Sequence, residues 1–277
     1  MASVLVFDSG SGGLSVLKEI RSLLPGQDCH YLADVAAFPY GNWEEGALAE
    51  HVVGLTSDAV EKTGAGVLVI ACSTASTLVL PLLRERLTIP IVGTVPAIKP
   101  AAALTDTGVI SVLAKPGTVK RDNTFEMIAK WAPETAINLV GSENLAEMAE
   151  QKLAGHPVDG QRLAAEIDPC FVEKDGRRAD VLVLGCTHYP FLADDIERYA
   201  KWPVRLVDPS AAIARRVAEV LGKNIADVLP GGHQSDNGRA SEAGALTFET
   251  TGAQSDFPSI ARSALGLKNF NDLSTDP

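Results

Sequence analysis

Two cysteines occupy the same place in an internal repeat of the chain. Residues 67–76 read VLVIACSTAS and residues 181–190 read VLVLGCTHYP: four apolar residues, a small residue, a cysteine and a hydroxyl residue. A thiolate can remove a proton from carbon, and a thiol can return one. If the copies belong to similar lobes facing one another, a carbon held between Cys72 and Cys186 can lose a proton to one sulfur and gain one from the other. Such a site inverts a stereocentre.

The elements expected around Cys72 and Cys186 favour ionised thiols at both positions. Each cysteine follows an apolar run typical of a buried parallel strand, at the edge where α/β sheets bind ligands. We expect a helix to begin beside each one, so that unpaired N–H groups and the positive end of the helix dipole lower the thiol pKa. Cys29 and Cys170 lack this context, and we interpret both as structural.

A glycine-rich turn, FDSGSGG, carries Asp8 and Ser9 directly after the first predicted strand. Its N–H groups and the serine hydroxyl suit a carboxylate. Nucleotide phosphate fits poorly, because the turn has neither the GxGxxG spacing nor a following GK[ST]. The alternative is a plain tight turn in which Asp8 caps the next helix.

Further polar side chains are expected at the same sheet edge. Asp34 closes the second predicted strand, and the turn FPYGNW places Tyr40 and Gly41 nearby. Thr74 and Thr187 lie one or two positions past the thiols, where their hydroxyls can cap a helix or bind a ligand.

His188 lies two residues after Cys186 and can tune that thiol, accept its proton or be structural. A zinc site assembled from these two residues and distant ligands is disfavoured, because the 4 cysteines include no CxxC pair.

Short apolar strands alternate with helical stretches almost throughout, which predicts an α/β fold with parallel sheets. We expect about four strands in each of two lobes, because the two cysteine repeats lie in separate halves of this pattern. The predicted strands cover 4–7, 29–32, 67–71, 91–92, 108–113, 136–139, 181–184 and 204–207. One predicted helix begins at Leu14, and another, after the strand over 181–184, ends at Ala200. The predicted helices between them cover 44–62, 74–86, 118–131, 143–154 and 161–172.

Proline-rich turns at 94–100 and 207–209 predict two crossings between the lobes. The first lobe is then discontinuous, with residues 1–94 and 208–268, and the second comprises residues 95–207. A helix over 210–221 and a strand over 245–250 return to the first lobe. Residues 230–242 are expected to form a loose loop, and residues 269–277 a frayed tail.

The composition limits the classes of function. The chain has 277 residues, 46% of them hydrophobic, a net charge of -11 and a pI near 4.9, which argues against a nucleic-acid-binding surface. Its start, MASVLVFDSG, does not resemble a signal peptide, and no apolar run is long enough to span a membrane. We therefore expect a cytoplasmic protein with reduced thiols.

The motifs FDSGSGG, FPYG, ACSTAS, VGTVPAIKPA and GCTHYP together resemble those of the glutamate racemase family, within the cofactor-independent amino-acid racemase superfamily. The resemblance is clear over residues 4–222 and weaker in ALTFETTG. It implies two α/β lobes related by a pseudo-twofold axis, with the active site between them and no pyridoxal phosphate, metal or other cofactor. It also implies interconversion of L- and D-glutamate, which supplies D-glutamate for peptidoglycan synthesis, cell wall biogenesis and cell shape.

The resemblance assigns roles to the candidate residues. Cys72 would take the α-proton of D-glutamate and Cys186 that of L-glutamate, assisted by Asp8 and His188 respectively. Asp8 would also meet the substrate ammonium group. The other residues implied in substrate binding are Ser9, Tyr40 and Gly41 for the side-chain carboxylate, and Thr74 and Thr187 for the α-carboxylate. The family also has a glutamate before the second thiol, which Glu147 and Glu150 fit equally.

Ser73 departs from the family pattern, which has asparagine in the corresponding ACNTAS motif. A hydroxyl has less reach than an amide, so weaker binding or altered specificity is expected at this position. Three alternatives stay open: a racemase of another diacid such as aspartate, a ligand-binding relative with impaired catalysis, and thiol redox chemistry at Cys72 and Cys186. The expected partner is a small-molecule amino acid, and the sequence leaves a homodimer open.

Overall fold

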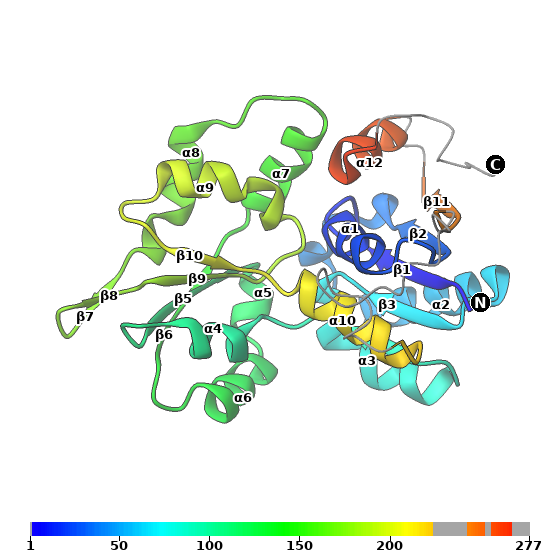
Figure 1. The fold of residues 1–277 in the computed structure, drawn as a ribbon, viewed down its shortest axis with the longest axis horizontal. Helices are drawn as coiled ribbons and strands as arrows, with labels where there is room; N and C mark the ends of the chain where they lie inside the picture. The colour runs from blue at the N-terminus through cyan, green and yellow to red at the C-terminus, as the bar shows by residue number, and fades with distance from the viewer. Residues whose placement is uncertain (1, 224–242, 253–255, 268–277) are drawn as a thin grey trace, which may run out of the picture. The chain divides into compact units, whose positions relative to one another are not determined.

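The computed structural model describes residues 2–223, 243–252 and 256–267. The chain divides into two compact units (Figure 1): residues 1–94 with 210–277 form unit 1, and residues 95–209 form unit 2. Each unit is described by itself. The predicted loop at 230–242 and the predicted frayed tail at 269–277 lie outside the described residues.

Unit 1 is built on a parallel five-stranded sheet with the order β11-β2-β1-β3-β4. Its strands are β1 (Val4–Asp8), β2 (Cys29–Ala33), β3 (Val67–Ile70), β4 (Ile91–Gly93) and β11 (Leu246–Thr250). β1 and β3 are buried along their whole length, which explains their continuous apolar sequences. β11 is the strand predicted over 245–250; it returns to the edge at β2 and brings the sheet to five strands, one more than the approximate four expected per lobe.

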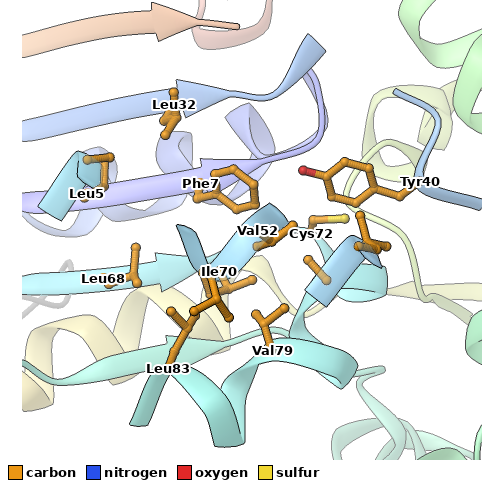
Figure 2. Close-up of a cluster of buried hydrophobic side chains, with 14 of the residues drawn as sticks. Leu5, Phe7, Leu32, Tyr40, Val52, Leu68, Ile70, Cys72, Val79 and Leu83 are labelled. Atoms are coloured by element: carbon orange, nitrogen blue, oxygen red, sulfur yellow. The ribbon is translucent and has the colours of Figure 1, made fainter. Parts of the chain in front are cut away.

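Helices cover both faces of this sheet. They are α1 (Leu14–Leu23), α2 (Glu45–Thr63), α3 (Ser73–Arg86), α10 (Ser210–Val220) and α12 (Phe257–Leu265), with short 3₁₀ turns η1 (Val35–Ala37) and η2 (Tyr40–Asn42). α1 packs against α10 and α12, and α2 packs against α3. Figure 2 shows the core beneath α2 and α3, where Phe7 of β1 and Ile70 of β3 are register partners on one sheet face.

Unit 2 is built on a parallel four-stranded sheet with the order β10-β9-β5-β6. Its strands are β5 (Val109–Ala114), β6 (Ala136–Gly141), β9 (Val181–Leu184) and β10 (Arg205–Val207). Its helices are α4 (Ile98–Leu104), α5 (Pro116–Val119), α6 (Asp122–Trp131), α7 (Leu145–Leu153), α8 (Gly160–Ile167) and α9 (Ala193–Tyr199), with 3₁₀ turns η3 (Asp168–Cys170) and η4 (Tyr189–Leu192). Val112 and Val183 are register partners in the core on the α4 face.

Two predicted helices of unit 2 are wrong in extent. The helix expected over 118–131 is divided into α5 and α6, because Arg121 adopts an extended backbone conformation. The helix expected over 161–172 ends at Ile167 and is followed by η3, where Pro169 lacks the N–H needed to continue an α-helix.

A two-stranded hairpin in unit 2 was not predicted. β7 (Glu173–Lys174) and β8 (Arg177–Arg178) pair antiparallel around Asp175 and Gly176, whose φ angles are 52° and 73°. Positive φ at both turn positions is the geometry that an Asp-Gly dipeptide favours in tight hairpins. The Asp175-Gly176 dipeptide was therefore the sequence signal that could have indicated this hairpin.

None of the helices that the structure describes is long and apolar enough to cross a membrane.

Candidate active site

Cys72 lies where the chain leaves the sheet of unit 1 and enters a helix. β3 ends at Ile70, and Cys72 is the N-cap residue of α3 with an extended conformation. The helix predicted to begin beside this cysteine is confirmed, and the positive end of its dipole lies at the thiol. Cys72 is only 4% exposed. The buried Ser73 and Thr74 form the beginning of the first turn of α3.

The turn after β1 brings Ser9 to Cys72. The Ser9 Oγ and Cys72 Sγ atoms are 3.6 Å apart. Asp8 is fully buried, and its Oδ1 accepts a hydrogen bond from the Gly10 N–H at 3.0 Å. The N-cap of α1 is Gly13, so the alternative in which Asp8 caps this helix is wrong. A Cβ added at Gly13 would lie 2.7 Å from the Asp8 Cβ, which explains the glycine there.

Tyr40 lies beside Cys72 in the core of unit 1 (Figure 2). Its hydroxyl donates a hydrogen bond to Asp34 Oδ2 at 2.6 Å. Burial, the hydrogen bond to Asp34 and the charge of Cys72 all raise the pKa of Tyr40, so the phenol stays protonated. Since a phenol has one proton, and Tyr40 donates it in the hydrogen bond to Asp34, any further hydrogen bond of the Tyr40 oxygen is one that it accepts.

Asp34 is fully buried and collects two further hydrogen bonds. His51 Nε2 lies 2.7 Å from Asp34 Oδ2, and Thr251 Oγ1 donates to Oδ1 at 2.6 Å. His51 and Thr251 were not singled out in the sequence, because α2 and the end of β11 reach this carboxylate only in the folded unit. Gly41 lies in η2 next to Tyr40, and an added Cβ there would meet no atom within 4 Å.

Cys186 lies at the corresponding edge of the sheet in unit 2. β9 ends at Leu184, and the Gly185 N–H donates to the Leu113 carbonyl of β5 at 2.7 Å. A Cβ added at Gly185 would lie 2.8 Å from the Ala114 Cβ, so only glycine allows this close approach. Cys186 is 4% exposed, and the adjacent Thr187 is also buried.

His188 connects the Cys186 thiol to a carboxylate. The Cys186 Sγ and His188 Nδ1 atoms are 3.7 Å apart, and His188 Nε2 lies 2.7 Å from Glu150 Oε1 on α7. Between the two candidate glutamates, the contact is therefore made by Glu150. Glu147 Oε1 instead accepts a hydrogen bond from Gln151 at the surface.

Electrostatics at Cys186 and His188 favour an ion pair. Burial alone would raise the pKa of Cys186, but the hydrogen bond from His188 and the positive charges of Lys115 and His188 lower it below its ordinary value. Burial would lower the pKa of His188, but hydrogen bonds to Cys186 and Glu150 and their negative charges raise it to about 10. Both shifts favour a thiolate at Cys186 beside an imidazolium at His188.

The helix predicted to begin beside Cys186 is wrong. The chain after Cys186 forms η4 from Tyr189, and α9 begins only at Ala193. The two repeats therefore stabilise negative charge differently: Cys72 lies at a helix N-terminus, whereas Cys186 lies beside His188 and Lys115. Lys115 was not identified in the sequence, because its proximity to Cys186 follows from the pairing of β5 with β9.

All four cysteines are buried and free of disulfides. Burial raises the pKa of Cys29 and of Cys170 to about 12, so both remain neutral thiols, as expected of structural cysteines. Within the described ranges, no three His, Cys, Asp or Glu side chains gather as metal ligands would.

Comparisons with known proteins agree on one family. A family model described as Asp/Glu/Hydantoin racemase matches residues 11–217. The chain is 51% identical over 219 residues to a glutamate racemase of Mesorhizobium japonicum, covering 79% of this chain and 84% of that protein. It is 50% identical over 236 residues to a glutamate racemase of Sinorhizobium fredii, covering 85% and 86% respectively.

Solved structures give the same result. The fold is similar to that of Escherichia coli glutamate racemase in complex with L-glutamate and the activator UDP-MurNAc-Ala, with a TM-score of 0.81 and 40% identity, covering 99% of this chain and 97% of that one. A glutamate racemase isoform of Bacillus anthracis has a TM-score of 0.81 and 26% identity, covering 99% and 96%.

Proposed function

The chain belongs to the Asp/Glu/Hydantoin racemase family, and we propose that it is a cofactor-independent glutamate racemase that uses two thiols. The observation that carries the two-thiol mechanism is the recurrence of a buried cysteine at the carboxyl edge of each parallel sheet. Relatives about half identical in sequence are glutamate racemases, and one similar structure contains L-glutamate, which supports glutamate as the substrate.

Cys186 acts as the base toward L-glutamate. Its thiolate, held by His188, removes the α-proton, and the Cys72 thiol delivers a proton to the other face of the same carbon. The product is D-glutamate, and the enzyme is left with a Cys186 thiol and a Cys72 thiolate. This form binds D-glutamate and runs the reaction in reverse: the Cys72 thiolate removes the α-proton, the Cys186 thiol delivers its proton, and His188 stabilises the negative charge that develops on Cys186.

The α-proton of an amino acid is weakly acidic, so negative charge that develops on the substrate carboxylate must be stabilised by the protein. Hydroxyl and N–H donors aimed at that charge commonly contribute about 3–4 kcal/mol each. The donors proposed for this purpose lie in the first turn of α3 and after β9: Ser73, Thr74 and Thr187.

Asp8 and Tyr40 are assigned to the substrate ammonium group. Asp8 is a buried carboxylate in the Ser9 turn, and Tyr40 presents an acceptor oxygen because its O–H donates to Asp34. The side-chain carboxylate is then left to Ser9 and to the backbone near Gly41. D-glutamate is a precursor for peptidoglycan, which connects the activity to cell wall biogenesis and cell shape. A cytoplasmic location and a homodimer stay predictions.

A circular-dichroism assay tests the reaction and the substrate together. Each glutamate enantiomer is incubated with the purified protein without added cofactor, with L- and D-aspartate as controls. We expect the circular-dichroism signal of each glutamate enantiomer to decay to zero and that of each aspartate enantiomer to stay constant. Racemisation of aspartate alone would assign another diacid, and binding of glutamate without racemisation would identify an impaired relative. Oxidation of Cys72 or Cys186 in place of racemisation would indicate thiol redox chemistry.

A further inference from the structure

Lys115 leaves the sheet of unit 2 next to Cys186. β5 ends at Ala114, and Lys115 is the extended N-cap residue of α5. β5 pairs in parallel with β9, with Leu113 opposite Leu184, so both strands end at the same edge (Figure 1). Lys115 lies one residue past its strand, and Cys186 lies two residues past the neighbouring strand.

The segments that follow β5 and β9 lie close together. The hydrogen bond from the Gly185 N–H to the Leu113 carbonyl extends the pairing beyond β9, and the missing side chain of Gly185 lets its backbone lie against Ala114. Lys115 and Cys186 directly follow these two residues. The Lys115 side chain is half-buried, so water screens its charge less than at an exposed lysine.

We propose that Lys115 is a positioning residue for the Cys186 thiolate, holding negative charge on the sulfur before the α-proton of L-glutamate is removed. The inference rests on the proposed racemase function and deepens it. Lys115 provides at Cys186 the positive charge that the N-terminus of α3 provides at Cys72, because no α-helix begins at Cys186.

The other groups that act on Cys186 in the described part of unit 2 do not duplicate this role. His188 shares its proton with the sulfur and is itself bound to the Glu150 carboxylate. Tyr189 is a fully buried phenol whose hydroxyl donates to the Ser142 carbonyl, and burial raises its pKa, so it stays neutral. Lys115 is thus a cation that acts on Cys186 independently of the shared proton.

The test measures ionisation of each active-site thiol without turnover. Wild-type protein and the variants Lys115→Met, Lys115→Gln and Lys115→Arg are alkylated with iodoacetamide across a pH series. Peptide mass spectrometry then gives the rate at Cys186 and, in the same sample, at Cys72. Lys120→Met is the matched control, because Lys120 is exposed at the end of α5 and does not act on Cys186.

We expect the pH midpoint of the alkylation rate at Cys186 to rise by about one pH unit in Lys115→Met and Lys115→Gln, because a nearby opposite charge favours the thiolate. Lys115→Arg keeps the charge and should restore the wild-type midpoint. The midpoint for Cys72 should not move in any variant. The kcat/KM of Lys115→Met should fall by the same factor for L-glutamate and for D-glutamate, since the two enantiomers have equal free energies in solution.

An unchanged Cys186 midpoint in folded Lys115→Met or Lys115→Gln overturns the inference, and so does an equal shift in Lys120→Met. A shift at Cys72 as large as that at Cys186 also overturns it. If the wild-type protein fails to racemise glutamate while the Cys186 midpoint still depends on Lys115, the proposed function is wrong and the electrostatic role of Lys115 stands.

Discussion

The chemistry of each sulfur depends on the few groups in contact with it. At Cys186, burial opposes ionisation, and His188 and Lys115 overcome it. At Cys72, the neighbours are the Ser9 hydroxyl and the start of α3. In the proposed mechanism Cys72 and Cys186 each serve one face of the substrate, so neither thiol can take over the role of the other.

Replacing either thiol should therefore abolish racemisation. We expect Cys72→Ala and Cys186→Ala to retain less than a few per cent of the wild-type turnover, measured by circular dichroism, with folding checked by thermal unfolding. Cys170→Ala is the matched control, because Cys170 is buried equally well and lies outside both sites. It should keep its activity, and substantial racemisation by either of the other two variants would disprove the two-thiol mechanism.

Glu150 should control the protonation of His188. Glu150→Gln removes the carboxylate that, with Cys186, raises the His188 pKa to about 10, so this pKa should fall toward the ordinary value of 6.5. Imidazole NMR signals measure the shift, and kcat should fall about 10- to 100-fold, since catalytic proton transfer contributes roughly that order or more. Glu147→Gln, three residues earlier on α7, should change neither quantity, and an equal effect of the two variants would contradict the role of Glu150.

Ser73→Asn should lower KM for glutamate. The amide reaches further than the hydroxyl and offers both a donor and an acceptor, in the ground state as well as in the transition state. Steady-state kinetics should therefore show a change mainly in KM, with kcat nearly unchanged. A folded variant with an unchanged or raised KM would show that Ser73 already binds the substrate adequately.

At the scale of elements, the approach of β5 to β9 positions Cys186 and Lys115. Gly185→Ala places a Cβ 2.8 Å from Ala114, so the strand ends must separate. We expect a loss of about 1–3 kcal/mol in the free energy of unfolding, as for other overpacked sites, together with lower turnover. Gly117→Ala is the control, because an added Cβ there meets no atom within 4 Å. Denaturant unfolding measures the stability of the two variants, and equal free energies of unfolding would contradict the packing argument.

Elements with a strong local signal could be predicted from the sequence. β1 and β3 each contain four consecutive buried apolar residues, and their ends placed Asp8 and Cys72 at one sheet edge. The break between α5 and α6 was missed: Lys120 and Arg121 favour a helix, but Arg121 is extended, and the weak helix formers Asp122 and Asn123 that follow it were the available signal.

Contacts between segments far apart in the sequence could not be predicted either. Glu147 and Glu150 lie on the same short helix, and only the packing of α7 against η4 brings one of them to His188. Lys115 and His51 give no signal in their own surroundings, because each depends on the register of a neighbouring element. Local pattern thus predicts the strands and their ends, and tertiary packing determines which polar partners meet there.

At the scale of the whole molecule, the proposed mechanism divides one reaction between two units. Cys72 belongs to unit 1 and Cys186 to unit 2. In the proposed mechanism each of them is the acid or base for one face of the substrate. A single base that serves both faces would carry the original hydrogen across. Isotope entry distinguishes these mechanisms.

We expect D-glutamate formed from L-glutamate in heavy water to be almost fully α-deuterated from its first appearance. Cys186 removes the α-hydrogen, and Cys72, already exchanged with solvent, delivers deuterium. The remaining L-glutamate should stay largely protiated at early conversion. Mass spectrometry of the separated enantiomers in the first few per cent of reaction measures this, and substantial α-protium in the new D-glutamate would refute the assignment of the two thiols.

The discontinuity of unit 1 has a consequence for protein synthesis. Unit 2 is continuous in sequence, whereas β2 gains its outer neighbour β11 only when residues 246–250 have been translated. At roughly 5–20 residues per second, the ribosome takes on the order of ten seconds to travel from the end of the first segment to that strand. During this interval β2 is an open sheet edge, the kind of surface that recruits other strands and promotes aggregation. Until β11, the last strand in the described residues, has been made, the edge of β2 on that side stays unpaired.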